Sequence, residues 1–467
     1  MVAPYREESF VVVELGGYTT KAMQDVSDVN KLPTVHIRAR AGILKQDQPQ
    51  TGSPGAGDAP MQVDAPEPQP DGQGASGAES SAATINDKGD NNAEDDDDEL
   101  SGPNYVFGSA LESAGQGGAL ERTVDIMPGG VVEDWDALSA FLRHVVTREL
   151  GIRILGNASA FLFSVPPLWT KADQENLVQI AFEHLNAPAV AVMEQPLMAL
   201  YGNNKVSGVV IDVGHGVTTV SPVVDSCVQS SCVVRSAAAG LAVTRALRRL
   251  LQEDPAVRSQ FDAGVVPLEF AAALKEAGRC TLHPAPAPAP AEAAAAATAD
   301  GDTGGEKAPA APEPFEFGGK QYAVSSSALA GAAEVLLDGA DGQAGDSLAG
   351  LVHRAVLGCD PDRRAALWES LHLVGGSSQL PGLRERLQAD LEATVLPASN
   401  IFAVTQTRDV AFHAIPEYLV GWRNHAHWTP FLGACLAAKV MLADSKHFVS
   451  RAEYNDGGPS TIHTKAF

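Results

Sequence analysis

The feature that most restricts the fold of this chain is a strand-like apolar run that ends in a glycine turn, and it occurs three times. The three stretches are "FVVVELGGYTTKAM" (residues 10–23), "VVIDVGHGVTTVSPVVD" (209–225) and "LHLVGGSSQLPGLRERLQADL" (371–391). The first two end their strand in an acidic residue and continue as hairpins, whereas the third leads into a helix. Glycines let backbone N–H groups reach a phosphate, and a strand-end carboxylate can orient water around Mg²⁺. Each turn alone also fits an ordinary hairpin or strand-to-helix turn, so the order of the three carries the signal.

The segments between these turns alternate between strand and helix patterns. "SAFLFSV" (159–165) predicts a strand, and "WTKADQENLVQIAFEHLN" then predicts a helix with Thr170 as N-cap and Asp173 three residues later. "DWDALSAFLRHVVTREL" (134–150) carries apolar residues at helical spacing, and "APAVAVM" (187–193) predicts another short strand. Such alternation predicts an α/β fold in which helices cover largely buried sheets.

Two segments differ in composition from the rest of the chain. Residues 45–103 hold 14 acidic residues, two lysines and almost no aliphatic residues, which predicts a disordered acidic insertion. Residues 283–314 alternate proline and alanine, which predicts an extended linker. Both are expected to be insertions into a folded body, either as solubilising surface loops or as interaction segments.

Charge and cysteine usage exclude some classes of function. The formal net charge of −25 argues against general binding of nucleic-acid phosphates, which needs a basic face. The five cysteines, at positions 227, 232, 280, 359 and 435, have no metal-ligand spacing and are expected to be free thiols in a reducing compartment. The N-terminus has no apolar core of the signal-peptide kind, and no run is long enough to span a bilayer. We therefore expect a soluble, intracellular protein.

Short sequence motifs along most of the folded chain resemble motifs of the actin family. "GGVVEDWDALSAFLRHV" resembles its Gly-x-Val-x-(Asn/Asp)-Trp-Asp segment, "LKEAGRC" its Lys-Glu helix beside the ribose, and "LVGGSSQLPGLRERL" its adenosine-side Gly-Gly motif. The C-terminus, "FVSRAEYNDGGPSTIHTKAF", is similar to the specific ending of that family. The resemblance implies an actin-like, ribonuclease H-like duplicated fold of two lobes around a central cleft. It places the first lobe at 1–201 and 428–467 and the second at 202–427.

The resemblance also implies a nucleotide cleft. The residues that match its nucleotide-binding positions are Glu14, Gly16, Lys21, Asp212, Gly214, Gly216, Lys275, Glu276, Gly375 and Gly376. Gln195 matches the glutamine of the catalytic hinge. No metal ligands are assigned.

Several positions depart from the family pattern. Gly17 lacks the hydroxyl that would contact the terminal phosphate, and Tyr18 replaces a glycine. In the second loop His215 stands in place of an acid, and Thr219 replaces the histidine that orients the attacking water. Because phosphate burial needs several charge-assisted hydrogen bonds at once, we expect a degenerate site without enzyme activity, for which ATP/Mg is not required and binds weakly at best. The ring of Tyr18 is expected to fill part of the space of a β-phosphate, and His215 to be a hairpin residue without a ligand.

Within the family, the stretches "PEYLVGW", "FLGACLAAKVML" and "EYNDGGP" resemble the class of the fungal nuclear actin-related protein number nine of SWI/SNF and RSC chromatin remodellers. This resemblance implies a nuclear, non-polymerising scaffold that pairs with a second actin-related protein. The pair would hold the helicase-SANT-associated helix of a motor subunit, with no membrane and no sequence-specific nucleic acid as partner. The acidic insertion, where an actin has its small mobile domain, is expected to oppose filament packing and to leave only a fragment of that domain.

The partner helix is expected at the end of the cleft opposite the nucleotide, built from residues 166–170 and 428–442. The candidate contacts are Trp169, Trp428, Phe431 and Leu432, each of which also fits ordinary core packing. The alternative function is an active actin-like ATPase in another nuclear or cytoskeletal assembly. A sugar or acetate kinase on the same fold has little support, because the actin-type C-terminus has no reason to be there.

Overall fold

The computed structural model describes residues 6–45, 105–282, 312–338, 347–395, 409–441 and 445–465. Nearly all of the predicted acidic insertion and most of the predicted Pro/Ala linker lie outside these residues. Among the residues described, no helix has the length and apolar character needed to cross a bilayer. All five cysteines are free, with Cys227 exposed and the other four buried.

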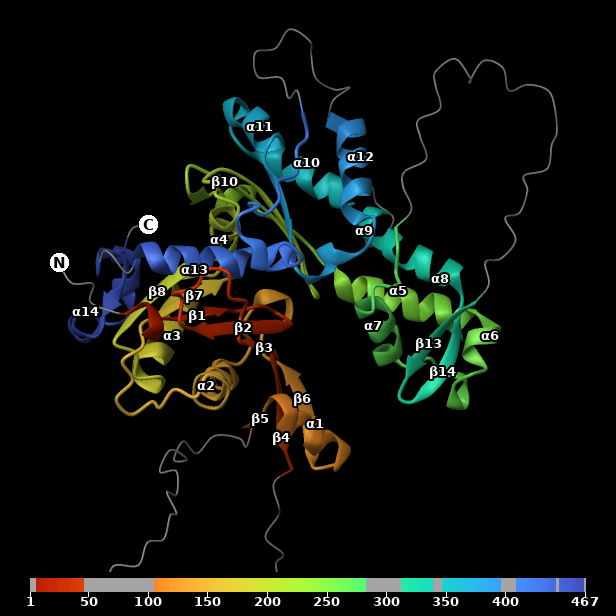
Figure 1. The fold of residues 1–467 in the computed structure, drawn as a ribbon, viewed down its shortest axis with the longest axis horizontal. Helices are drawn as coiled ribbons and strands as arrows, with labels where there is room; N and C mark the ends of the chain where they lie inside the picture. Colours follow the sequence, from red (N-terminus) through yellow and green to blue (C-terminus); the bar gives the residue numbers. More distant parts are fainter. Residues whose placement is uncertain are drawn as a thin grey trace, which may run out of the picture.

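The first sheet has six strands in the order β16-β8-β7-β1-β2-β3. Strand β1 is antiparallel to β2 and parallel to β7, as the hairpin reading of residues 10–23 predicted. Figure 1 shows this sheet with the helices that lie around it, which are α2, α3, α4, α13 and α14. The strand bounds are β1 (Val11–Glu14), β2 (Thr19–Gln24), β3 (Val35–Arg38), β7 (Phe161–Val165), β8 (Ala189–Glu194) and β16 (Val449–Ser450). The helix bounds are α2 (Trp135–His144), α3 (Lys171–Gln179), α4 (Gln195–Gly202), α13 (Thr429–Met441) and α14 (Arg451–Gly457).

Strand β1 is apolar from Val11 to Val13 because both faces of its sheet are covered, and it ends in Glu14 at the cavity between the lobes. Val11 and Val13 join the core cluster that contains α2 and α3, while Phe10 and Val12 join the cluster that contains α4 and α13. Successive side chains of a strand point to opposite faces, so the part of a strand that lies between two helical layers is apolar at every position. The predicted helix from Thr170 is confirmed, with a complete capping box between Thr170 and Asp173.

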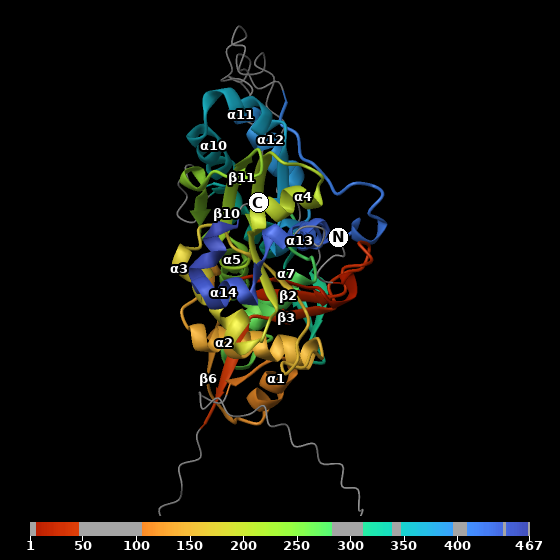
Figure 2. The same cartoon turned by 90° about the vertical axis from the view of Figure 1, so that its left-hand side faces the viewer.

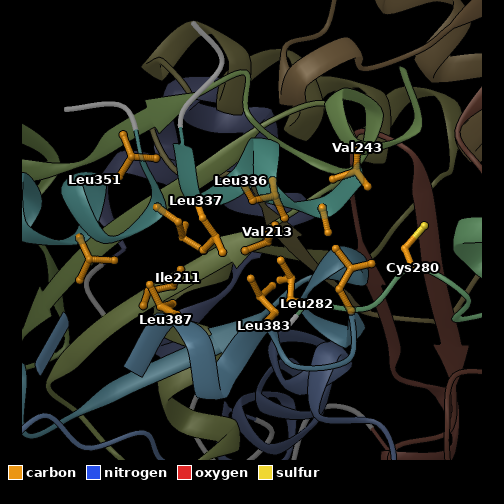
Figure 3. Packing of buried hydrophobic residues seen from close by; sticks show 14 of the residues in the cluster. Ile211, Val213, Val243, Cys280, Leu282, Leu336, Leu337, Leu351, Leu383 and Leu387 are labelled. Carbon is orange, nitrogen blue, oxygen red and sulfur yellow. The ribbon is translucent and has the colours of Figure 1, made fainter. Parts of the chain in front are cut away.

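The second sheet repeats this plan. Strand β9 is antiparallel to β10 and parallel to β15, as β1 is to β2 and β7. Figure 3 shows Ile211 and Val213 of β9 packed among Leu336, Leu383 and Leu387. The strands are β9 (Gly208–Val213), β10 (Thr218–Val224), β11 (Cys227–Val228), β12 (Val234–Ser236) and β15 (Leu371–Val374), and the helices are α10 (Leu348–Gly358), α11 (Pro361–Trp368) and α12 (Leu383–Val395). The repeated plan is the two-lobed, duplicated α/β fold that the sequence predicted.

Each lobe carries an outer part. On the first lobe, β4 (Arg40–Leu44), β5 (Tyr105–Val106) and β6 (Leu120–Asp125) form a three-stranded sheet with α1 (Gly108–Gln116). This outer part lies at the bottom of Figures 1 and 2, and it is more complete than the fragment predicted from the sequence. On the second lobe the outer elements are α5 (Gly240–Glu253), α6 (Pro255–Arg258), α7 (Leu268–Glu276), β13 (Glu313–Phe317), β14 (Lys320–Val324), α8 (Ser326–Gly331) and α9 (Val335–Asp338). Strand β13 begins inside the predicted 283–314 linker, so the last residues of that linker are structured.

Helices α4 and α13 join the two lobes. They lie between the sheets in Figure 1, and their core cluster includes residues of both, such as Val12 of β1 and Val210 of β9. A Cβ atom on Gly433 of α13 would overlap the backbone of α4, so this helix pair depends on a glycine for its close approach. Trp422, which the predicted boundary assigns to the second lobe, is buried and donates its indole N–H to the carbonyl of Val29 in the first lobe at 2.7 Å.

Candidate functional site

A cavity of about 500 Å³ lies between the two lobes, where the β1–β2 and β9–β10 hairpins face each other. All the residues predicted for the nucleotide cleft line it, namely Glu14, Gly16, Lys21, Asp212, Gly214, Gly216, Lys275, Glu276, Gly375 and Gly376. Gln195 and Thr219 also line it. Strand ends and helix starts from both lobes therefore meet at one site, which is where ligands bind in many α/β proteins.

The floor of the cavity holds a buried ion pair. Glu14 and Lys21 are directly opposite each other on β1 and β2, and their Oε1 and Nζ atoms are 2.7 Å apart. Both side chains are only 8% exposed, so solvent screens their attraction weakly. The positive charge of Lys21 is thus already balanced by a protein carboxylate, which weakens its attraction for a phosphate.

Asp212 lies beside this pair at the end of β9. Burial raises the pKa of Asp212 to about 6, and the neighbouring Glu14 carboxylate adds to the rise while Lys21 opposes it. The second oxygen of Glu14 has no hydrogen-bond partner among the described residues. The described residues also contain no group of three or more His, Cys, Asp or Glu arranged to hold a metal ion.

Four side chains connect the two lobes at the cavity, and three of them line it. We call this group the interlobe clasp: Tyr18, Arg38, His215 and Glu276. The rings of Tyr18 and His215 stack with centroids 3.8 Å apart and planes inclined by 16°. The Tyr18 hydroxyl donates to Glu276 Oε1 at 3.3 Å, and Arg38 lies 3.6 Å from the same oxygen. The guanidinium carbon of Arg38 is 4.7 Å from the centre of the Tyr18 ring. Tyr18 and Arg38 belong to the first lobe and the other two to the second, so the stack, the hydrogen bond and the ion pair all cross the cleft.

The pKa values within the clasp follow from its burial. Burial, together with the nearby cations Lys275 and Arg38, lowers the pKa of His215 to about 4. Burial also raises the pKa of Tyr18, an effect that Arg38 opposes. At neutral pH the stack therefore consists of an uncharged imidazole and an uncharged phenol.

The turn at residues 127–130 closes the same edge of the cavity. A Cβ atom on Gly17 would lie 2.8 Å from the carbonyl oxygen of Met127, which leaves no room for a larger residue in this conformation. Arg235 of the second lobe donates a hydrogen bond to the carbonyl of Gly129. The space that a hydroxyl-bearing side chain would need at position 17 is thus taken by this turn.

Comparison with protein families decides the relationship. The family model described as Actin matches residues 6–263 and 310–467. The chain belongs to the actin family. Actin-related protein 7 of Oryza sativa subsp. indica is 27% identical over 358 residues, which cover 76% of this chain and 89% of that protein. Actin-related protein 7 of Arabidopsis thaliana is 25% identical over 353 residues, covering 74% and 85%, and Actin-like protein 9 of Mus musculus is 24% identical over 353 residues, covering 74% of each.

The actin-family cleft of this chain differs from the family pattern in several contacts around the two hairpins. Gln195 donates its amide N–H to the carbonyl of Leu15 at 2.8 Å, which ties the hinge helix α4 to the first hairpin. Thr219 is buried opposite Asp212 on β10, where its short side chain cannot take the place of an imidazole. Together with the paired Lys21 and the turn against Gly17, these residues do not fit a bound triphosphate.

The residues predicted to contact a partner helix occupy different places. Phe431 and Leu432 are completely buried in the cluster between the lobes, so the prediction for these two is wrong and they are core residues. Trp428 lines the cavity, stacked on His425 with ring centroids 4.9 Å apart, rather than lying at the opposite end. This position also corrects the expected location of the segment that starts at residue 428.

Trp169 is the member of the predicted set that keeps a partly exposed side chain away from the cavity lining. It is half-buried, donates its indole N–H to the carbonyl of Gly130 at 3.0 Å, and meets Trp135 edge-on at 5.9 Å between ring centroids. Leu168 beside it is 40% exposed. Trp169 therefore stays the candidate partner contact of this set.

Sequence reasoning missed the clasp residue Arg38 and the cross-cleft residue Arg235. Neither lies in a glycine turn or in a matched family motif, and their partners on the other lobe are more than one hundred positions away in the sequence. One sequence signal could have indicated the clasp. In the two hairpins that face each other, Tyr18 replaces a glycine and His215 replaces an acidic residue, so two aromatic rings are introduced together.

Proposed function

We propose that this protein is a non-polymerising actin-related scaffold subunit of a SWI/SNF- or RSC-type chromatin-remodelling complex in the nucleus. It pairs with a second actin-related protein on a helix of the motor subunit, and its finer class is that of the fungal actin-related protein number nine. The cleft contributes shape rather than catalysis, and no nucleotide is required.

The observation that carries this proposal is the interlobe clasp. In the cleft, where a nucleotide-dependent protein needs free phosphate-binding groups, the two lobes are bridged by Tyr18 and His215. The only lysine of the β1–β2 hairpin is neutralised by Glu14. An actin fold that keeps its two lobes and its C-terminal motif, but lacks free phosphate-binding groups, is suited to bind protein partners through the shape of its surface.

The alternative, an active actin-like ATPase, has one observation in its favour. Acidic and basic residues at the family positions, including Asp212 and Lys275, still line a common cavity. However, Lys275 donates its ammonium proton to the carbonyl of Gly240 at 2.9 Å, so this charge is also engaged within the protein.

The partner claim is tested by recovering the tagged full chain from nuclear extract and identifying the bound subunits. We expect a remodeller motor subunit together with a second actin-related protein. Recovery of cytoskeletal or dynein-activator subunits without a remodeller motor would reject the assignment. Trp169→Ala is expected to reduce the recovery of the motor, while Leu155→Ala, at a leucine that is 82% exposed, serves as the matched control.

The nucleotide claim is tested separately with labelled ATP and Mg²⁺ at micromolar concentration. We expect no saturable binding and no turnover. Tight binding with hydrolysis would support the ATPase alternative instead.

A further inference from the structure

We propose that the interlobe clasp holds the two lobes closed without any ligand, so that closure of the cleft is a property of the chain itself. The clasp joins the lobes through elements other than the α4–α13 hinge pair. A two-lobed protein attached only at a hinge can open by rotation, whereas one attached at two separated places must break the second attachment first.

The clasp contacts come from four different elements and join the lobes in pairs. Tyr18 lies in the β1–β2 turn and Arg38 at the end of β3, while His215 lies in the β9–β10 turn and Glu276 at the end of α7. Tyr18 contacts both second-lobe members, and Glu276 contacts both first-lobe members. Opening of the cleft would therefore separate the stacked rings, the hydrogen bond and the ion pair in one movement.

The ring stack is the main element of this attachment. Its centroid distance and small interplanar angle are those of a close stacked pair, and the rings are partly removed from solvent. The Arg38–Glu276 ion pair is about half-exposed at both ends, so it contributes little on its own and acts mainly by orienting the Tyr18 ring and hydroxyl. The Arg235 hydrogen bond to Gly129 adds a link between the same two lobes nearby.

Two features explain why the clasp and a ligand that touches both hairpins exclude each other. Tyr18 and His215 both line the cavity, at the point where the two glycine turns approach each other. A ligand between these turns would have to separate the stacked rings, which have no gap between them at 3.8 Å. The clasp thus takes the bridging position for itself.

What a fixed closed shape contributes to the assembly of a complex rests on the proposed function. A scaffold that is recognised by the relative placement of its lobes gains from a closure that does not vary with nucleotide concentration. Preorganisation of this kind reduces the ordering cost of binding for any partner that contacts both lobes.

The test is hydrogen exchange of the full chain, read at an amide on the lobe opposite the substitution. The amide of Leu241 donates to the carbonyl of His215 and reports on the second lobe, while Tyr18 belongs to the first. We expect Tyr18→Ala to speed exchange around Leu241 by about two- to tenfold, the range that the loss of one aromatic pair allows. Tyr18→Phe keeps the stack and is expected to have a smaller effect, and Tyr418→Ala, at an exposed tyrosine outside the clasp, is expected to have none.

The outcomes separate this inference from the proposed function. Unchanged exchange at Leu241 in Tyr18→Ala, or slower exchange of the wild type on addition of MgATP, would overturn the clasp inference whatever partners the chain recovers. If Tyr18→Ala does not fold, Glu276→Ala removes the hydroxyl acceptor and the ion-pair partner from the second lobe, and it is read at the first-lobe amide of Ala39, which donates to the carbonyl of Tyr18. Faster exchange at Leu241 in Tyr18→Ala, together with a wild-type chain that recovers no remodeller, would keep the clasp and reject only the assembly.

Discussion

The buried Glu14–Lys21 pair provides a test of the electrostatics of the cleft. The two substitutions to compare are Lys21→Met and Glu14→Gln. Lys21→Met leaves the carboxylates of Glu14 and Asp212 next to each other without a cation, whereas Glu14→Gln leaves Lys21 with Asp212 as a substitute counter-ion. Removing one partner of a buried pair costs about 3–5 kcal/mol when no substitute exists. We therefore expect Lys21→Met to lose stability in that range, and Glu14→Gln to lose only about 1–3 kcal/mol, as for an unsatisfied buried group.

The assay is urea unfolding at pH 7.5, with the free energy extrapolated linearly to water. A double variant, Glu14→Leu with Lys21→Met, is the control, because replacing both members of a buried pair with apolar groups is often neutral. It is expected to be more stable than Lys21→Met alone. The reasoning is refuted if Lys21→Met costs less than about 1 kcal/mol, or if Glu14→Gln is the more damaging of the two.

Three further substitutions test other parts of the fold. Because the pKa of Asp212 in the folded chain is about 6 and thus above its ordinary 3.8, the folded state binds the proton more tightly and gains stability as pH falls through 6. This gain is on the order of 1 kcal/mol between pH 7.5 and 5, and urea unfolding of Asp212→Asn at both pH values is expected to lack it. Gly433→Ala is expected to lower the free energy of unfolding by about 1–3 kcal/mol or more through overlap with α4, whereas Gly376→Ala, with nothing within 4 Å of the added Cβ, is expected to stay within about 0.5 kcal/mol. Trp422→Phe removes the donor to the Val29 carbonyl and is expected to cost about 1–3 kcal/mol in the same measurement, and an unchanged value would show that the carbonyl finds another partner.

Local patterns were sufficient to predict much of the fold. The capping box of α3 involves Thr170 and Asp173, which are neighbours in sequence, and the same is true of the hairpin that pairs Glu14 with Lys21. The apolar run of β1 reported that both of its faces are covered. Such interactions depend on residues a few positions apart, so a single sequence contains the information.

Contacts between distant segments were not predictable in this way. The buried position of Phe431 and Leu432 depends on how α13 packs against α4 and both sheets. Helix α13 is apolar on most of its surface, with Lys439 as its one charged residue, so its sequence does not distinguish a face that packs in the core from one that binds a partner. The role of Arg38 depends on its closeness to Glu276, which no local pattern encodes. The residues that the family resemblance assigns to the cleft all line one cavity. The resemblance can bring them together because it includes information on contacts between distant segments, which local patterns lack.

The small sheet of the first lobe has a consequence for how the chain can change in length. Ile43 of β4 pairs directly with Tyr105 of β5, so the described chain before residue 46 and after residue 104 ends and resumes at adjacent strand positions. For a flexible chain that joins two such positions, the entropy of closure grows only with the logarithm of the number of residues, by about 0.6 kcal/mol for each doubling. The pairing of β4 with β5 thus sets almost no thermodynamic limit on the number of residues between the two strands.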